Sequence, residues 1–134
     1  MKQLRWKTVL CVCAIALSAC AHVPASTALS DSELVETSGL AATRSGELGY
    51  WALNDGGHRN ILFRLDARGD TVARLPVRGA RNTDWEDLAS FSWRGAHWLL
   101  IADVGDNAAR RARVSLYLVP EPSAGDSAAT VHAA

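Results

Sequence analysis

Short apolar runs alternate with turn-forming residues between Leu34 and Val119. The turns that separate these runs are rich in Gly, Asn, Asp and Arg. Apolar runs bounded by such turns are typical of β-strands. The predicted strands are Thr37–Thr43, Gly49–Leu53, Ile61–Leu65, Thr71–Leu75, Trp85–Trp93, His97–Ala102 and Val114–Val119. No window of helical length carries a sustained stripe with a 3.6-residue period, so the sequence predicts an all-β fold.

The strand pattern repeats at an offset of 48 residues. The gap-free alignment pairs Glu36 with Asp84, Gly39 with Asp87, Leu40-Ala41 with Leu88-Ala89, Trp51–Leu53 with Leu99–Ile101, Asp55 with Asp103 and Gly57 with Gly105. A period of about 40 to 50 residues with four short strands is typical of a β-propeller blade. The second copy has three clear strands, and only 130–132 could supply its fourth. We therefore expect a partial propeller of about two four-stranded antiparallel blades; a single β-sandwich is the alternative.

The repeat leaves too little chain for a closed propeller. Residues 34–122 hold fewer than two full repeats of 48 residues, whereas closed propellers have about four to eight blades. Such a domain exposes apolar sheet faces and strand edges, which invite pairing with other chains. We expect either self-association of several copies or a fragment that lacks C-terminal blades. The small-residue tail 123–134 loses the strand pattern and favours the fragment.

The first twenty residues have the layout of a secretory signal. Three basic residues, Lys2, Arg5 and Lys7, precede an apolar run from Thr8 to Leu17. A basic region, a short apolar run and small residues at the cut are the parts of such a signal. The run is about ten residues long, and a membrane-spanning helix needs about 20. Residues 1–19 are therefore predicted to be a removable signal peptide.

The tetrad Leu-Ser-Ala-Cys at residues 17–20 resembles the lipobox of bacterial lipoproteins. The resemblance implies cleavage before Cys20 and attachment of diacylglycerol to its thiol, which would anchor the protein to a membrane. Ala21 implies the outer membrane of the cell envelope in a two-membrane cell. An ordinary secreted protein is the alternative. Residues 20–33 are small and polar and predict a lipidated tether.

Composition excludes several classes of function. Residues 1–19 hold three of the 14 basic residues and none of the 14 acidic ones, so the remaining 115 residues carry 11 arginines against 14 acids. No basic tract for nucleic acid is present. The cysteines lie at positions 11, 13 and 20. Once Cys20 is acylated, the mature domain has no disulfide, no cysteine nucleophile and no cysteine-zinc site.

Acidic residues gather where the predicted strands begin and end. In an antiparallel pair the start of one strand lies beside the end of its neighbour, so these side chains are expected to meet at one end of the sheets. The candidate oxygen ligands are Asp84, Glu86, Asp87, Asp103, Asp106 and Asn107, with Glu36 and Asp55 as first-repeat counterparts. Oxygen ligands without His or Cys favour calcium over zinc. For Asp55 and Asp106, ordinary turn chemistry is an equal alternative.

Five motifs resemble a family of bacterial β-propeller lipoproteins. The motifs are E-x-SGLA at Glu36–Ala41, W-x-x-ND-x-G at Trp51–Gly57, DWEDLA at Asp84–Ala89, D-V-GDN at Asp103–Asn107 and LY-x-V-x-EP at Leu116–Pro122. This family is distantly similar to phytase-like, esterase-like and gluconolactonase-like propellers, which hold calcium near their axis. The resemblance implies a calcium-binding or ligand-binding domain.

An enzymatic role is the alternative to simple binding. The distant resemblance would imply a calcium-dependent hydrolase of esters or phosphoesters, or an inactive fragment of one. The sequence contains no G-x-S-x-G nucleophile motif and no phosphate-binding glycine loop. No catalytic residue is therefore assigned, and the ligand is not specified by the sequence.

Overall fold

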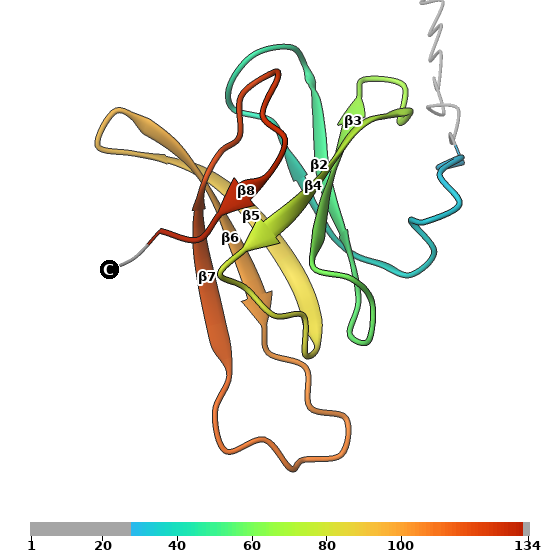
Figure 1. Cartoon of the computed structure of the whole chain (residues 1–134), viewed down its shortest axis with the longest axis vertical. Helices are drawn as coiled ribbons and strands as arrows, with labels where there is room; N and C mark the ends of the chain where they lie inside the picture. Colours follow the sequence, from blue (N-terminus) through green and yellow to red (C-terminus); the bar gives the residue numbers. More distant parts are fainter. Residues whose placement is uncertain (1–27, 133–134) are drawn as a thin grey trace, which may run out of the picture.

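All regular structure in residues 28–132 is β (Figure 1). The computed structural model describes residues 28–132; the predicted signal peptide, Cys20 and the first part of the predicted tether lie outside the described residues. The strands are β1 (Thr37–Ala42), β2 (Gly49–Asn54), β3 (Ile61–Asp66), β4 (Thr71–Arg78), β5 (Trp85–Trp93), β6 (Ala96–Asp103), β7 (Ser115–Pro120) and β8 (Ala129–Thr130). Within residues 28–132 no helix is present that could cross a membrane. The all-β prediction is confirmed.

The strands form two sheets. The first has the order β1-β2-β3-β4-β8 and the second the order β5-β6-β7. Neighbouring strands are antiparallel except for β4 and β8, which are parallel. The described residues do not close into a propeller, as the number of repeats predicted.

The prediction that residues 130–132 complete the second sheet is wrong. Strand β8 pairs instead with β4 of the first sheet, where Val77 is opposite Ala129 and Arg78 opposite Thr130. The N–H of His132 then donates to the carbonyl of Leu118 on β7, at 2.7 Å. The last segment therefore lies between the edges of both sheets, as Figure 1 shows. Two open edges offer unpaired backbone groups, and this segment uses both.

The two sheets share one hydrophobic core. Trp51 and Leu53 of the first sheet pack with Trp85 and Ile101 of the second. The sheets approach closely at Gly39 on β1, where an added Cβ would lie 2.8 Å from the Cβ of Leu88. Only glycine allows this approach of β1 to β5.

The pairing registers correct the sequence repeat by one residue. Thr37 is opposite Asn54 in the first sheet, and Trp85 is opposite Asp103 in the second. The offset is therefore 48 between β1 and β5 but 49 between β2 and β6. The equivalent of Asp103 is Asn54, and the gap-free pairing with Asp55 is wrong. The hairpin of β5 and β6 contains one residue more than the hairpin of β1 and β2. The gap-free sequence alignment did not allow for this extra residue.

Hydrogen bonds support the corrected equivalence. The side-chain oxygen of Asn54 accepts the N–H of Glu36 at 3.2 Å, and that of Asp103 accepts the N–H of Asp84 at 2.9 Å. Each bond fixes the entry of the chain into the first strand of its sheet. Both sheets therefore have the same hydrogen bond at the same end.

With this register, both sheets present equivalent faces in the same direction. Trp51 of β2 faces the second sheet, and its equivalent Leu100 lies on the face of β6 that points away from the first sheet. Conversely, Ile101 faces the first sheet, and its equivalent Ala52 lies on the outer face of β2. The second sheet thus follows the first in the same orientation.

The segment before β1, from residue 31 to residue 34, packs on the outer face of the first sheet. Leu34 is buried with Ile61 and Phe63. Asp31 forms an ion pair with Arg74 of β4, with 2.7 Å between its Oδ2 and the arginine Nη2. Residues from 31 onward therefore contact the sheet.

Candidate metal centre

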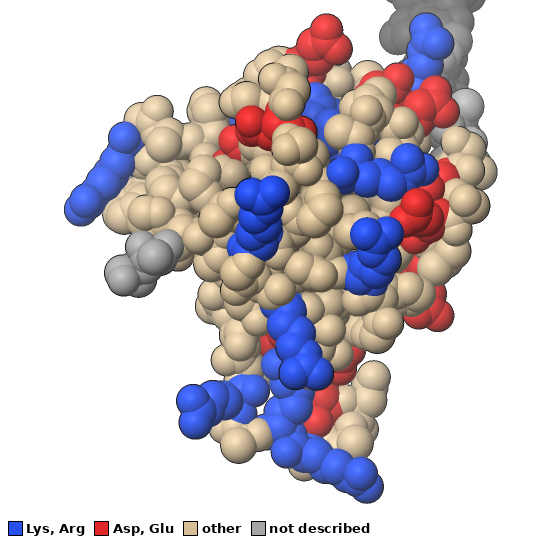
Figure 2. All heavy atoms as spheres, in the orientation of Figure 1, with Lys and Arg blue, Asp and Glu red and all other residues tan. Residues whose placement is uncertain are grey.

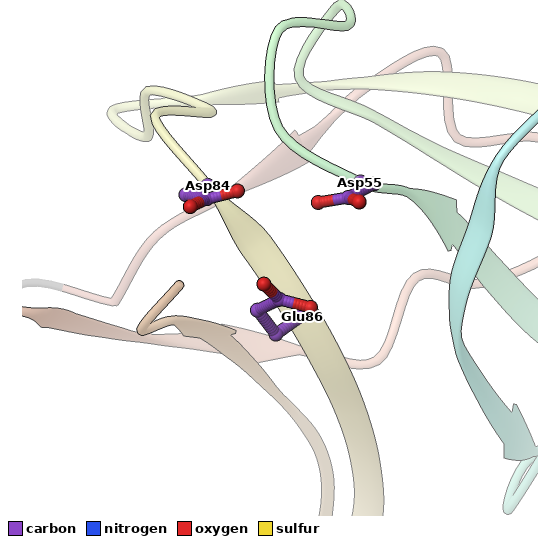
Figure 3. A group of neighbouring side chains, drawn as sticks. All are labelled: Asp55, Asp84 and Glu86. Carbon is purple, nitrogen blue, oxygen red and sulfur yellow. The ribbon is translucent and has the colours of Figure 1, made fainter. Parts of the chain in front are cut away.

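Three carboxylates meet where the two sheets adjoin (Figure 3). Asp55 follows the last residue of β2, Asp84 precedes the first residue of β5, and Glu86 is the second residue of β5. One oxygen from each lies within 4.8 Å of the others. Figure 3 shows the three side chains directed toward a common space, one from the first sheet and two from the second. The predicted meeting of strand starts and strand ends holds for this group.

Local hydrogen bonds position the three backbones. The N–H of Asp55 donates to the carbonyl of Glu36 at 2.9 Å, and its carbonyl accepts the side-chain amide of Asn82 at 2.8 Å. Asp84 is held by its N–H bond to Asp103. A register shift between Trp85 and Asp87 leaves Glu86 as the extra residue of a β-bulge. These contacts fix the space between the carboxylates before any ligand arrives.

Two glycines make room for the Asp84 carboxylate. A Cβ added to Gly56 would overlap Asp84, and one added to Gly105 would overlap both Asp84 and Glu86. The backbone of each turn therefore borders the carboxylates directly. The glycines of the Asp55-Gly56 and Val104-Gly105 turns are needed for this close approach, apart from any role in the turns themselves.

Electrostatic repulsion is built into the group. Partial burial raises the pKa of Asp84, and the nearby Asp55 carboxylate raises it further. The pKa of Glu86 is raised by partial burial and then by Asp55 and Asp84. Among the described residues, no Lys, Arg or His forms an ion pair with any of the three. The positive charge of Arg111 partly offsets the effect on Asp84, and the cluster keeps an excess of negative charge.

Asp103 and Asp106 do not join the cluster. Asp103 is buried and forms an ion pair with Arg111, at 2.8 Å from its Oδ1 to the arginine Nη1. The oxygens of Asp106 accept the N–H groups of Arg110 and Arg111, both at 2.8 Å. These bonds lower the pKa of Asp106. Asp106 therefore organises the β6–β7 loop, as the turn alternative predicted.

The other three candidates also lie apart from the cluster. Glu36 contacts His58, with 2.9 Å between Oε2 and Nε2. Asp87 is exposed, and its Oδ1 accepts the N–H of Leu88 at 2.7 Å. Asn107 is exposed on the β6–β7 loop. The eight predicted ligands therefore divide into one converging group of three and five residues with other contacts or positions.

Sequence reasoning missed the role of Arg111. This residue lies in an arginine-rich loop whose side chains gather at the bottom of Figure 2. Its guanidinium also donates to the carbonyl of Gly105 at 2.8 Å, so it joins Asp103 to the turn beside the cluster. No local motif predicts this contact, because the pairing depends on how the loop folds back over β6.

A cavity in the described part of the domain lies apart from the cluster. A space of about 530 Å³ is lined by Trp51, Arg64 and Leu75 of the first sheet and by the loop 122–126. None of the three clustered carboxylates contributes to its walls. The cluster therefore stands at the end of the sheets and apart from this cavity.

The residue types of the cluster suit a hard divalent cation. Calcium prefers six to eight oxygen ligands from carboxylates, carbonyls and water. Three carboxylates can supply three to six of these oxygens, depending on whether each binds through one atom or two. Comparison of the chain with protein-family models, curated proteins and solved structures found no match. The geometry of the cluster is thus the basis for any functional assignment.

Proposed function

We propose that the protein is a calcium-binding domain of the cell envelope, with the ion held by Asp55, Asp84 and Glu86. The observation that carries the proposal is the convergence of three carboxylates without an ion-pair partner among the described residues. Partial burial and then mutual repulsion raise the pKa values of Asp84 and Glu86, and a bound cation offsets the repulsion. Carboxylate oxygens are the ligands that calcium prefers.

The ion joins the two sheets. Asp55 belongs to the turn after β2, whereas Asp84 and Glu86 belong to the start of β5. A cation bound by all three stiffens the junction between the sheets and does not require any catalytic group. The role is therefore structural support or ligand binding at this end of the domain.

The domain is of the propeller type. Successive blades of a propeller present the same face in the same direction around the axis. The equivalence of Trp51 with Leu100 and of Ala52 with Ile101 supports this arrangement. A sandwich built from the same repeat would instead bury equivalent faces against each other.

The domain is anchored to the membrane by lipid on Cys20, a proposal supported by the sequence of residues 1–20. In cells grown with labelled fatty acid, the native chain should incorporate label and Cys20→Ser should not. Cys13→Ser is the matched control, because it changes a thiol of the same segment and should leave labelling intact. Label on the Cys20→Ser chain would overturn the anchor.

Calorimetric titration with calcium tests the metal site. The full chain should bind one ion with a dissociation constant of roughly 0.1 to 1 mM, the range of extracellular calcium modules with few charged ligands. Asp55→Asn and Glu86→Gln should each weaken binding by about tenfold or more, since each removes a charged ligand. Asp87→Asn removes the same charge from the same strand outside the cluster and should bind normally. Equal affinity in all four proteins would disprove the site.

A further inference from the structure

Equivalent apolar positions in the two sheets differ in how far they are buried. Leu62 of β3, on the face of the first sheet that meets the second, is fully buried, with 0% of its surface exposed. Pairing through β2 and β6 makes Leu116 of β7 its equivalent. Leu116 is 62% exposed. The face that is buried in the first sheet is therefore exposed in the second sheet.

The opposite face shows the complementary difference. Leu88 of β5 faces the first sheet and is 4% exposed. Its equivalent on β1 is Leu40, which lies on the outer face of the first sheet and is 56% exposed. Each exposed leucine thus corresponds to a leucine buried at the junction inside the chain. Farther along this outer face, Ala52 and Phe63 are already buried with Leu34, so its exposed part lies at Leu40 on β1 and Tyr50 on β2. This exposed part and the open face of the second sheet are the two halves of a second junction of the same kind.

We propose that a second copy of the chain docks head to tail, with the open face of its β5-β6-β7 sheet against the outer face of β1 and β2 in the first copy. The contact repeats the junction between the two sheets within one chain. Leu116 of one copy and Leu40 of the next become buried, as Leu62 and Leu88 are buried within each copy.

Neighbouring residues extend both faces. On the second sheet, the row through Ala89, Leu100 and Leu118 matches the row through Ala41, Trp51 and Arg64 of the first. Trp93 at the end of β5 is exposed, and so is Tyr50 on the outer face of β2. Both faces therefore offer apolar side chains on two or more adjacent strands, which is the pattern expected of a protein interface.

The segment that leads into β1 does not block this docking mode. The chain enters the first sheet at Glu36 and the second at Asp84 through matching N–H bonds. The connection at 79–84 is accommodated at the junction inside the chain. An equivalent connection at 31–36 is therefore compatible with a second sheet docked beside β1.

One position makes the second junction looser than the first. Asp87 stands on β5 where Gly39 stands on β1. Gly39 allows the Leu88 side chain to approach its backbone, and any side chain there would overlap it. The Asp87 side chain of one copy therefore keeps Leu40 of the other copy farther away. Association between copies is weaker than packing within the chain for this reason.

Sedimentation of the full chain in mild detergent tests the proposal. The native chain should associate reversibly as its concentration rises. Leu40→Arg and Leu116→Arg each damage one face at an exposed position, so each variant should fold and should associate at least about tenfold more weakly. A mixture of the two variants should form a one-to-one dimer, because each variant keeps the face that the other lacks.

Each outcome decides the matter. If the native chain stays monomeric at every concentration, this result alone overturns the proposal. Association that survives in both variants, or a mixture that forms no dimer, overturns the head-to-tail mode. Asp87→Gly should tighten association, and unchanged or weaker association would show that the second junction does not repeat the first. Calcium plays no part in these contacts, so failure of the metal site leaves this test intact.

Discussion

Asp84 is the residue on which the candidate metal site depends. Its carboxylate lies between the turns at Gly56 and Gly105, and its N–H is held by Asp103. Its neighbours Asp55 and Glu86 bring like charge to the same space. A carboxylate held in this way is more easily protonated than a free one, which is the direction of its pKa shift.

The raised pKa values predict how stability depends on pH. A group whose pKa is raised by folding contributes stability below its ordinary pKa, near 4, and loses that contribution as the pH rises through the raised value. When a calcium chelator is present, the cluster should therefore destabilise the native protein increasingly as the pH rises from about 4 toward neutrality. Glu86→Gln removes part of the repulsion. The melting temperature of this variant should therefore rise relative to that of the native chain between about pH 4 and neutral pH.

Thermal melts of both proteins across this pH series check the prediction. Asp87→Asn serves as the control, because its charge lies outside the cluster and its removal should leave the difference from the native chain nearly constant with pH. A Glu86→Gln variant that loses stability relative to the native chain toward neutral pH would contradict the repulsion that we describe. Excess calcium should abolish the advantage of the variant.

At the residue scale, the sequence predicted where acidic side chains meet better than it predicted which of them take part. Oxygen ligands at strand starts and ends were expected, and Asp55, Asp84 and Glu86 do meet there. The pairing of Asp103 with Arg111 was not predicted, because it depends on the fold of a long loop. The role of Asp106 follows from its two local backbone bonds, which turn chemistry already explains.

At the scale of elements, local pattern predicted strands well and long-range pairing poorly. The alternation of apolar and polar residues located all seven main strands. Strand β4 runs to Arg78, beyond the predicted end at Leu75, because Val77 finds a partner in Ala129. A two-residue strand such as β8 has no periodicity of its own, so its choice of partner follows from which edges remain unpaired.

The docking of β8 can be tested at one buried position. Ala129 is buried against the core beside Val77, whereas the next residue, Thr130, is exposed. Ala129→Asp should destabilise the fold by about 1 to 3 kcal/mol, because it forces a charged group into an apolar contact or displaces the strand. Thr130→Asp places the same charge one residue away and should change stability by less than about 0.5 kcal/mol.

Urea unfolding of the two variants measures the difference. Hydrogen exchange adds a local readout, since the N–H groups of Val131 and His132 bond to Arg78 and Leu118. Both should lose protection in Ala129→Asp and keep it in Thr130→Asp. Equal stability of the two variants would mean that the final segment does not dock on β4.

At the scale of the whole molecule, a repeat that the sequence revealed only in part sets the arrangement of the sheets. The offset of 48 residues is correct for β1 and β5, but the extra residue in the second hairpin shifts β2 and β6 to 49. Because side chains alternate between faces, this single residue decides which faces meet. With the shift, the second sheet repeats the orientation of the first and leaves Leu40 on β1 and Leu116 on β7 exposed.

The same arrangement places the carboxylates. The junction of two similarly oriented sheets brings the turn after β2 beside the start of β5, and the three acids come from these two segments. The central claim is therefore that one cation is bound jointly by both sheets at their junction. Such an ion lies next to Trp85, the residue between Asp84 and Glu86 in the sequence.

Luminescence of terbium, a trivalent substitute for calcium, tests this claim most directly. Excitation of tryptophan should produce sensitised terbium emission from the native chain, because Trp85 lies beside the site, and added calcium should reduce that emission by displacement. Asp55→Asn and Glu86→Gln, one from each sheet, should both weaken the emission, and Asp87→Asn should not. Absence of sensitised emission, or emission that only one of the two sheets controls, would contradict a cation site shared between the sheets.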